Sequence, residues 1–209
     1  MTLRSRAAIL AICLATLTVL SATAQAYVLL GVIWPQPTMT YYVNPANVDL
    51  PPALIQPAVQ AGADAWRLQA GRFAFAFGGF TSQTTNTFDG INLIVFRNET
   101  SGSAIATTYS WFSGTRIVDA DIVFWDGGFQ FFTGNAGCAG GFYIEDVATH
   151  EFGHALGLGH STVAAATMFP SLSFCSQQAR SLDPDDIAAV SAIYPSNKPN
   201  PPTGLRIIR

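Results

Sequence analysis

The segment that most constrains this chain of 209 residues runs from His150 to His160, reads HEFGHALGLGH and contains all three histidines. Residues four apart lie on one face of a helix, so His150 and His154 can present two imidazoles to one metal ion. Gly157 can end that helix in a left-handed conformation, and the chain can then return with His160. Three nitrogen ligands and an open position are typical of catalytic zinc, and Glu151 lies close enough to reach a water on the metal. The pattern therefore predicts one zinc ion, with Glu151 as the catalytic base.

The alternative is a polar helix end that carries ordinary surface histidines. Five residues of the extended pattern are fixed in this chain, namely His150, Glu151, His154, Gly157 and His160. At roughly one in twenty for each fixed residue, a chance match to the whole pattern is rare. The sequence favours the metal site.

At these residues the chain resembles the metzincin zinc endopeptidases, whose pattern HExxHxxGxxH is followed by a methionine turn. Met168 stands where that turn would be, and Ser161 together with the order Met168, Phe169, Pro170 resembles the matrixin family within that clan. The resemblance implies an α+β metzincin-type catalytic domain over residues 27–195. Its expected parts are a twisted, mixed, mostly parallel sheet, a zinc-binding active-site helix, a second packing helix and a C-terminal helix.

A compact, secreted, microbial-type zinc endopeptidase is the activity that this resemblance implies. Zinc would activate a water, and Glu151 would take its proton and pass it to the leaving amine. Met168 would form an apolar floor beneath the metal. Two alternatives remain open: an inactive zinc-binding adhesion or interaction module, and a zinc hydrolase of a non-peptide bond. Glu151 disfavours the first, because zinc binding requires the histidines but no base.

The resemblance also implies how a protein or peptide substrate would bind. The strand over residues 117–125 would be the sheet edge that pairs with an extended substrate. The segment over residues 161–174, STVAAATMFPSLSF, would wall the pocket for the substrate residue after the cut bond. It carries no charge, so we expect an apolar residue there. Arg180 is a reservation, because its side chain could reach the pocket floor and admit an acid.

Two aspartates, Asp119 and Asp121, lie on the strand predicted over residues 117–125. In matrixins the aspartates of the corresponding strand can help to hold calcium, so Ca²⁺ is a second candidate ion. Solvated polar positions are an equally favoured interpretation. No histidine remains for a second, structural zinc, so the expected zinc content is one.

Residues 1–26 are typical of an export signal. Arg4 and Arg6 precede an apolar run from Ala7 to Leu20, and small residues lead to an expected cleavage point after Ala26, with Ala24 as the alternative. That apolar run has 14 residues, fewer than the ~20 that span a bilayer. We therefore expect a secreted, extracellular protein that does not contact a membrane after cleavage.

Removal of the signal lowers Lys plus Arg from 10 to 8 against 13 Asp plus Glu, which gives a formal net charge of −5. Because no cluster of Lys and Arg stands out, no nucleic-acid partner is expected. The expected mature protein is a monomer. Residues 196–209 are predicted to form a Pro-rich linker or tail, and TGLRIIR within them resembles the opening strand of a truncated fibronectin type III module.

The mature chain would contain two cysteines, Cys138 and Cys175. An even count in an exported protein predicts a disulfide, here around the 36 residues that include the zinc-binding helix. Such a loop closure is worth about 3 to 4 kcal/mol in the chain-entropy description. Cysteines as metal ligands are the weaker interpretation, because the three histidines already complete a catalytic set.

Hydrophobic periodicity predicts the remaining elements of the fold. Gly78 and Gly79 are expected to end the second strand, and Pro57 is expected to kink any helix that runs through it. Asp183 and Pro184 are typical of a helix start. A strand, helix, strand order favours a parallel crossover. The expected strands cover residues 39–43, 72–77, 91–96 and 117–125, and the expected helices cover residues 57–70 and 183–194.

Overall fold

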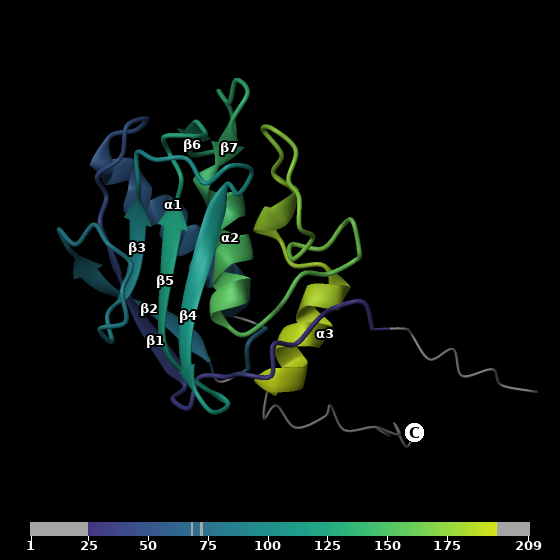
Figure 1. The fold of residues 1–209 in the computed structure, drawn as a ribbon. Helices are drawn as coiled ribbons and strands as arrows, with labels where there is room; N and C mark the ends of the chain where they lie inside the picture. Colours follow the sequence, from purple (N-terminus) through teal and green to yellow (C-terminus); the bar gives the residue numbers. More distant parts are fainter. Residues whose placement is uncertain (1–24, 68, 72, 196–209) are drawn as a thin grey trace, which may run out of the picture.

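The computed structural model describes residues 25–67, 69–71 and 73–195 (Figure 1). The predicted signal up to residue 24 and the predicted tail at residues 196–209 lie outside these residues. Its elements are, in order, β1 (Thr38–Val43), α1 (Pro52–Arg67), β2 (Ala74–Phe80), β3 (Asn92–Phe96), β4 (Ala106–Ser113), β5 (Arg116–Phe124), β6 (Phe131–Phe132), β7 (Phe142–Tyr143), α2 (Ile144–Ala155), the 3-10 helix η1 (Gln178–Arg180) and α3 (Pro184–Ile193).

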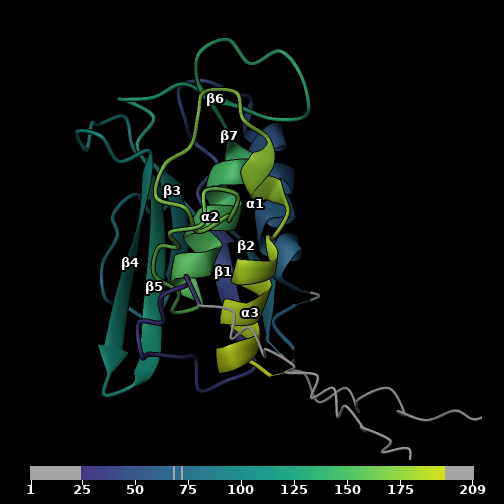
Figure 2. The same ribbon diagram turned by 90° about the vertical axis from the view of Figure 1, so that its right-hand side faces the viewer.

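Five strands form one mixed sheet in the order β2-β1-β3-β5-β4. The first four strands of that order pair in parallel, and β4 pairs antiparallel with β5. Figure 2 shows α1 and α2 on the same side of this sheet. The α+β class with a mixed, mostly parallel sheet is therefore confirmed. No helix among the described residues is long and apolar enough to cross a membrane.

The prediction that residues 117–125 form the edge of the sheet is wrong. The strand predicted over residues 117–125 is β5, which lies between β3 and β4. The edge is β4, which the sequence pattern did not predict as a strand. Its alternate residues Ala106, Thr108 and Ser110 line a cleft, and two of the three are polar, so the apolar alternation that marks a strand is weak there.

Helix α1 starts earlier than the pattern predicted and runs through Pro57. A proline inside a helix removes one backbone hydrogen bond. The turn before it nevertheless buries Ile55, which is fully inaccessible to solvent and shares the buried stripe with Val59, Ala63 and Trp66. Burial of a large aliphatic side chain contributes about 1.5 to 3 kcal/mol, which favours continuing the helix.

Strand β2 continues past the two glycines that were expected to end it. The register with β1 shifts between Tyr41 and Tyr42, so Gly78 is an extra residue in a β-bulge. A Cβ atom at Gly78 would lie 2.7 Å from Thr40 Cγ2 and 2.8 Å from Tyr42 Cζ, so a larger residue would have to displace these side chains. Glycine here permits the bulge, and the strand ends at Phe80.

Close packing of α1 against α2 fixes the active-site helix. A Cβ atom at Gly62 of α1 would lie 2.6 Å from Ala148 Cβ, so the two helix backbones meet at this glycine. Trp66 of α1 is fully buried, and its Nε1 donates to the Thr149 carbonyl of α2 at 2.8 Å. The carbonyl next to His150 is thus held by a residue of the core.

The C-terminal helix α3 begins as the sequence predicted. The Asp183 side chain accepts from the Asp185 N–H at 2.9 Å, and Asp186 Oδ2 accepts from the Asp183 N–H at 2.9 Å. These contacts belong to a capping box, with Pro184 in the first turn.

Candidate metal centre

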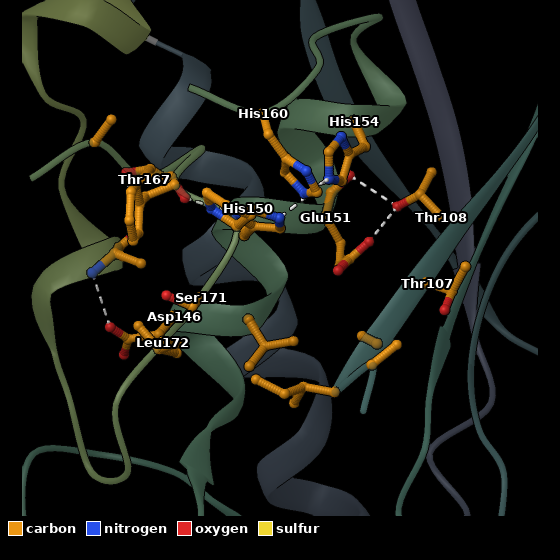
Figure 3. Close-up of a pocket in the computed structure, with 18 of the residues that line it drawn as sticks. Thr107, Thr108, Asp146, His150, Glu151, His154, His160, Thr167, Ser171 and Leu172 are labelled. Atoms are coloured by element: carbon orange, nitrogen blue, oxygen red, sulfur yellow. Dashed lines mark hydrogen bonds between the residues drawn. The ribbon is translucent and has the colours of Figure 1, made fainter. Parts of the chain in front are cut away.

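The three histidines converge at one point beside the cleft (Figure 3). His150 and His154 lie one turn apart on α2, and their Nε2 atoms are 3.0 Å apart. Gly157 ends the turn with φ +97, and a Cβ there would lie 2.2 Å from the Val32 carbonyl oxygen. The chain then brings His160 Nε2 to 3.2 Å from His154 Nε2. Helix spacing and a glycine turn build the triad as the pattern predicted.

Hydrogen bonds to the other ring nitrogens show that this triad fits a metal ion. His150 Nδ1 donates to the Thr167 carbonyl at 2.7 Å, and His154 Nδ1 donates to the Leu158 carbonyl at 2.8 Å. Each Nε2 of a neutral ring then carries a lone pair, and two such acceptors cannot hydrogen-bond to each other. A tetrahedral zinc with bonds of 2.0 to 2.1 Å needs nitrogen atoms roughly 3.3 Å apart. The spacing of the triad is close to that requirement.

Burial keeps these imidazoles neutral at physiological pH. It lowers the pKa of His150 and of His154 to about 4, because the interior disfavours the charged ring. Burial also lowers the pKa of His160. Neutral imidazoles are the form that binds a metal, so the triad is prepared for a cation before one arrives.

Glu151 lies next to the triad and is only 5% exposed. Burial raises its pKa, and the nearby His154 and a hydrogen bond from Thr108 act in the opposite direction. Thr108 Oγ1 lies 2.6 Å from Glu151 Oε2, and Figure 3 shows the carboxylate directed toward β4. The sequence pattern placed Glu151 beside the metal but gave no indication of Thr108.

The methionine turn packs against the active-site helix between the two helical histidines. Met168 is 1% exposed, and a Cβ at Gly153 would lie 2.2 Å from its Sδ. Asp186 of α3 anchors the turn, because its carboxylate accepts from the N–H groups of Thr167 at 2.7 Å and Met168 at 3.0 Å. The sequence gave Asp186 only a helix-end role, since its partners lie 18 and 19 residues away.

A cleft of about 670 Å³ lies against the triad and Glu151. One wall is the edge strand β4, and the other is the segment that includes Ala164, Phe169 and Leu172. Asp146 of α2 reaches the cleft on the side away from His154 (Figure 3). The cleft therefore joins a metal-binding triad, a carboxylate and a free strand edge.

Comparison with known proteins identifies the family. Residues 33–195 match the family described as Matrixin, which is more than half of the chain. The chain belongs to the matrixin family. Bovine (Bos taurus) interstitial collagenase is 51% identical over 59 residues, which cover 28% of this chain and 12% of that protein. Human (Homo sapiens) neutrophil collagenase is 49% identical over 59 residues, covering 28% and 13%.

A plant relative extends this set. Metalloendoproteinase 4-MMP of Arabidopsis thaliana is 47% identical over 54 residues, which cover 26% of this chain and 16% of that protein. The matched stretches are thus less than one fifth of each of these relatives. Within this matrixin, the histidine triad is the group of side chains that could hold a metal ion.

Calcium binding to this matrixin remains a prediction, but the alternative interpretation of Asp119 and Asp121 as solvated positions is wrong. Asp119 and Asp121 are fully buried. Asp121 accepts from the N–H groups of Leu93 at 2.8 Å and Thr87 at 2.9 Å, and burial raises its pKa to about 7. Asp119 Oδ2 accepts from the Gly90 N–H at 2.8 Å. The two carboxylates hold the loop before β3, and within the described ranges only the histidine triad groups three metal-ligating side chains closely.

The two cysteines of the matrixin domain form a disulfide, Cys138 to Cys175, with Cα atoms 5.5 Å apart. The Cys175 N–H also donates to the Gly141 carbonyl at 2.8 Å. The bond joins the glycine-rich approach to α2 with the end of the cleft wall. It thereby ties together the two segments that flank the active-site helix in sequence.

Proposed function

We propose that this matrixin is a secreted zinc endopeptidase that cleaves protein or peptide substrates. The observation that carries the proposal is the convergence of His150, His154 and His160 with the Glu151 carboxylate beside them, at the mouth of a cleft. Zinc binding alone would require the histidines only. The presence of a buried carboxylate next to the ligands favours a hydrolase over an inactive binding module.

His150, His154 and His160 would hold the zinc through their Nε2 atoms. When bound, zinc supplies a Lewis acid that lowers the pKa of a water to about 7 and polarises a carbonyl. Glu151 would accept a proton from the attacking water and deliver it to the leaving amine, as general base and then acid. The Thr167 and Leu158 carbonyls keep His150 and His154 in the tautomer that presents Nε2. Met168 and Gly153 supply an apolar support for the helix beneath these ligands.

An extended substrate would bind along the free edge of β4. An edge strand offers unpaired N–H and C=O groups, and a peptide that adds to it makes main-chain hydrogen bonds. β4 lies opposite α2 across the cleft, so a peptide on this edge would run past the triad. This assignment replaces β5, which has a neighbouring strand on both sides.

The pocket beside the triad suits an apolar substrate residue. Val147, Ala166 and Leu172 are among its lining side chains. Arg180 does not line it; its Nε donates to Asp146 Oδ2 at 2.5 Å and its Nη1 to Asn135 Oδ1 at 2.7 Å. The guanidinium is therefore already neutralised, and the reservation that it admits an acidic substrate residue loses its support.

We propose that the protein is made as a precursor. Residues 1–26 would direct export, residues 27–195 would form the catalytic domain, and residues 196–209 would form a linker or tail. A monomer with one zinc ion is the proposed active form. Calcium at Asp119 and Asp121 is proposed as a separate, structural addition, supported by Asp119 Oδ1, which is buried and has no hydrogen-bond partner among the described residues.

A casein digestion assay with and without a chelator tests this proposal. We expect cleavage by the zinc-loaded protein, its loss with 1,10-phenanthroline and its return when zinc is added. Zinc binding without cleavage of casein, gelatin or a peptide library would instead indicate a binding module. Zinc-dependent hydrolysis of an ester but of no peptide would indicate the third class.

A further inference from the structure

We infer that Thr108 is a positioning residue that holds the Glu151 carboxylate in its working orientation. The inference rests on the proposed function, because it concerns the group that would move the proton. It assigns a role to a side chain of the edge strand, 43 residues away in sequence from the glutamate. No part of the HExxH pattern contains this threonine.

Thr108 and Glu151 are in direct contact across the cleft. Thr108 Oγ1 lies 2.6 Å from Glu151 Oε2 and 3.1 Å from the Glu151 carbonyl oxygen. A hydroxyl has one proton to donate, and the shorter distance is typical of an O–H···O⁻ bond to a charged acceptor. Figure 3 shows Thr108 facing both oxygen atoms. The hydroxyl therefore fixes the carboxylate relative to β4.

The contact constrains one oxygen and leaves the other available. Oε1 of Glu151 accepts no hydrogen bond from a described residue, whereas Oε2 accepts the Thr108 bond. A base that must take a proton from a water needs one oxygen directed at that water. Without Thr108, the carboxylate could rotate about its terminal torsion, which has broad and shallow preferences. The hydroxyl thus removes a rotation that would turn the base away from the water.

The strand holds Thr108 firmly enough for this role. Thr108 pairs with Ile122 of β5, a fully buried residue in the middle of the sheet. The same strand offers the edge on which the substrate would bind. Thr108 therefore connects the base with the strand on which the substrate would bind. Because the Thr108 hydroxyl is bonded to the base, loss of this hydroxyl should lower the turnover rate rather than the substrate affinity.

Substitution by a residue of the same shape tests the inference. Thr108→Val keeps the branched side chain but has no hydroxyl, and Thr108→Ser keeps the hydroxyl. With a fluorogenic peptide we expect Thr108→Val to lower kcat about tenfold or more and to change KM by less than about twofold. Thr108→Ser should stay within about threefold of the wild-type kcat. A loss shared by both variants, or a change confined to KM, would overturn the inference.

Trp125→Phe is the matched control. Trp125 Nε1 donates to Thr107 Oγ1 of β4 at 2.9 Å, and Trp125 is not among the residues that line the cleft. This variant also removes one side-chain hydrogen bond to β4, so it reports what a weakened β4 costs. We expect its kcat to stay within about twofold of wild type. Equal losses in Trp125→Phe and Thr108→Val would assign the effect to the strand and contradict a specific role of Thr108.

Crystal structures give a readout that does not depend on activity. In zinc-loaded wild type we expect a single Glu151 conformation, with Oε2 within hydrogen-bond distance of Thr108 Oγ1. In Thr108→Val we expect the carboxylate to rotate or to occupy two positions. An unchanged, single conformation in that variant would refute the inference even if the wild type proved to have no peptidase activity. If Thr108→Val does not fold, Thr108→Ala and Thr108→Ser replace it, and equal Glu151 conformations in those two would refute it.

Discussion

Arg180 Nε donates to Asp146 Oδ2 at 2.5 Å, which joins the short helix η1 to the first turn of the active-site helix α2. The Asp146 side chain is fully buried, and the Arg180 side chain is 20% exposed. The guanidinium carbon also lies 4.5 Å from the centre of the Tyr143 ring. A cation in this position supports the helix that carries two histidines, and it is not among the residues that line the cleft.

Loss of this cation should therefore lower stability. Arg180→Met would leave the Asp146 carboxylate buried and unpaired, which costs about 3 to 5 kcal/mol in comparable buried pairs. The control is Arg67→Met, because Arg67 pairs with Asp64 at 3.5 Å on the surface, with side chains 63% and 45% exposed. We expect that control to change the free energy of unfolding by less than about 1 kcal/mol. Urea denaturation measures both, and equal losses would contradict the assigned importance of the buried pair.

Cleavage-site selection should follow the apolar character of the pocket. A charged substrate side chain would be buried there without a partner, whereas burial of Leu or Phe would gain about 1.5 to 3 kcal/mol. We expect Leu, Phe or a similar residue directly after the scissile bond in a proteome-derived peptide library. Arg180 is paired with Asp146, so it should not attract an acid. A dominant preference for Asp, Glu, Lys or Arg at that position would overturn the pocket assignment.

Zinc retention should depend on pH through the buried histidines. Burial lowers the pKa of His150 and His154 to about 4, so both rings stay neutral until the pH approaches that value. A protonated imidazole cannot bind zinc. Elemental analysis after dialysis should find full zinc content at about pH 6 and loss of zinc only at about pH 4 or below, because protons must displace the bound metal from the same nitrogen atoms. Half-loss near the ordinary histidine pKa of about 6.5 would show that the rings are not desolvated as described.

Local patterns predicted the parts of the fold that depend on near neighbours in sequence. The triad follows from the spacing of His150 and His154 on one helix face and from the glycine turn at Gly157, so its geometry is encoded in eleven consecutive residues. Strand β3 is fully buried, and its continuous apolar run revealed it. The start of α3 follows from the capping preference of Asp183. In each case the deciding contact lies within a few residues.

Long-range contacts explain what the sequence did not reveal. Strand β4 presents threonine and serine to a cleft, so it lacks the apolar alternation of a core strand. The burial of Asp121 depends on N–H groups of Leu93 and Thr87, which are 28 and 34 residues away. A carboxylate with such partners looks identical in sequence to a solvated one. The contact between Thr108 and Glu151 joins residues that are 43 positions apart, so the sequence did not reveal it either.

We expect Glu151 to perform the proton transfer while the three histidines hold the metal. The deciding measurement is the casein cleavage rate of Glu151→Ala at a zinc content equal to that of wild type, with His154→Ala as the variant that should lose zinc itself. We expect Glu151→Ala to bind one zinc per chain and to cleave at least about a hundredfold more slowly, because the base is gone and the ligands remain. A zinc-loaded Glu151→Ala protein that digests casein near the wild-type rate would contradict this account.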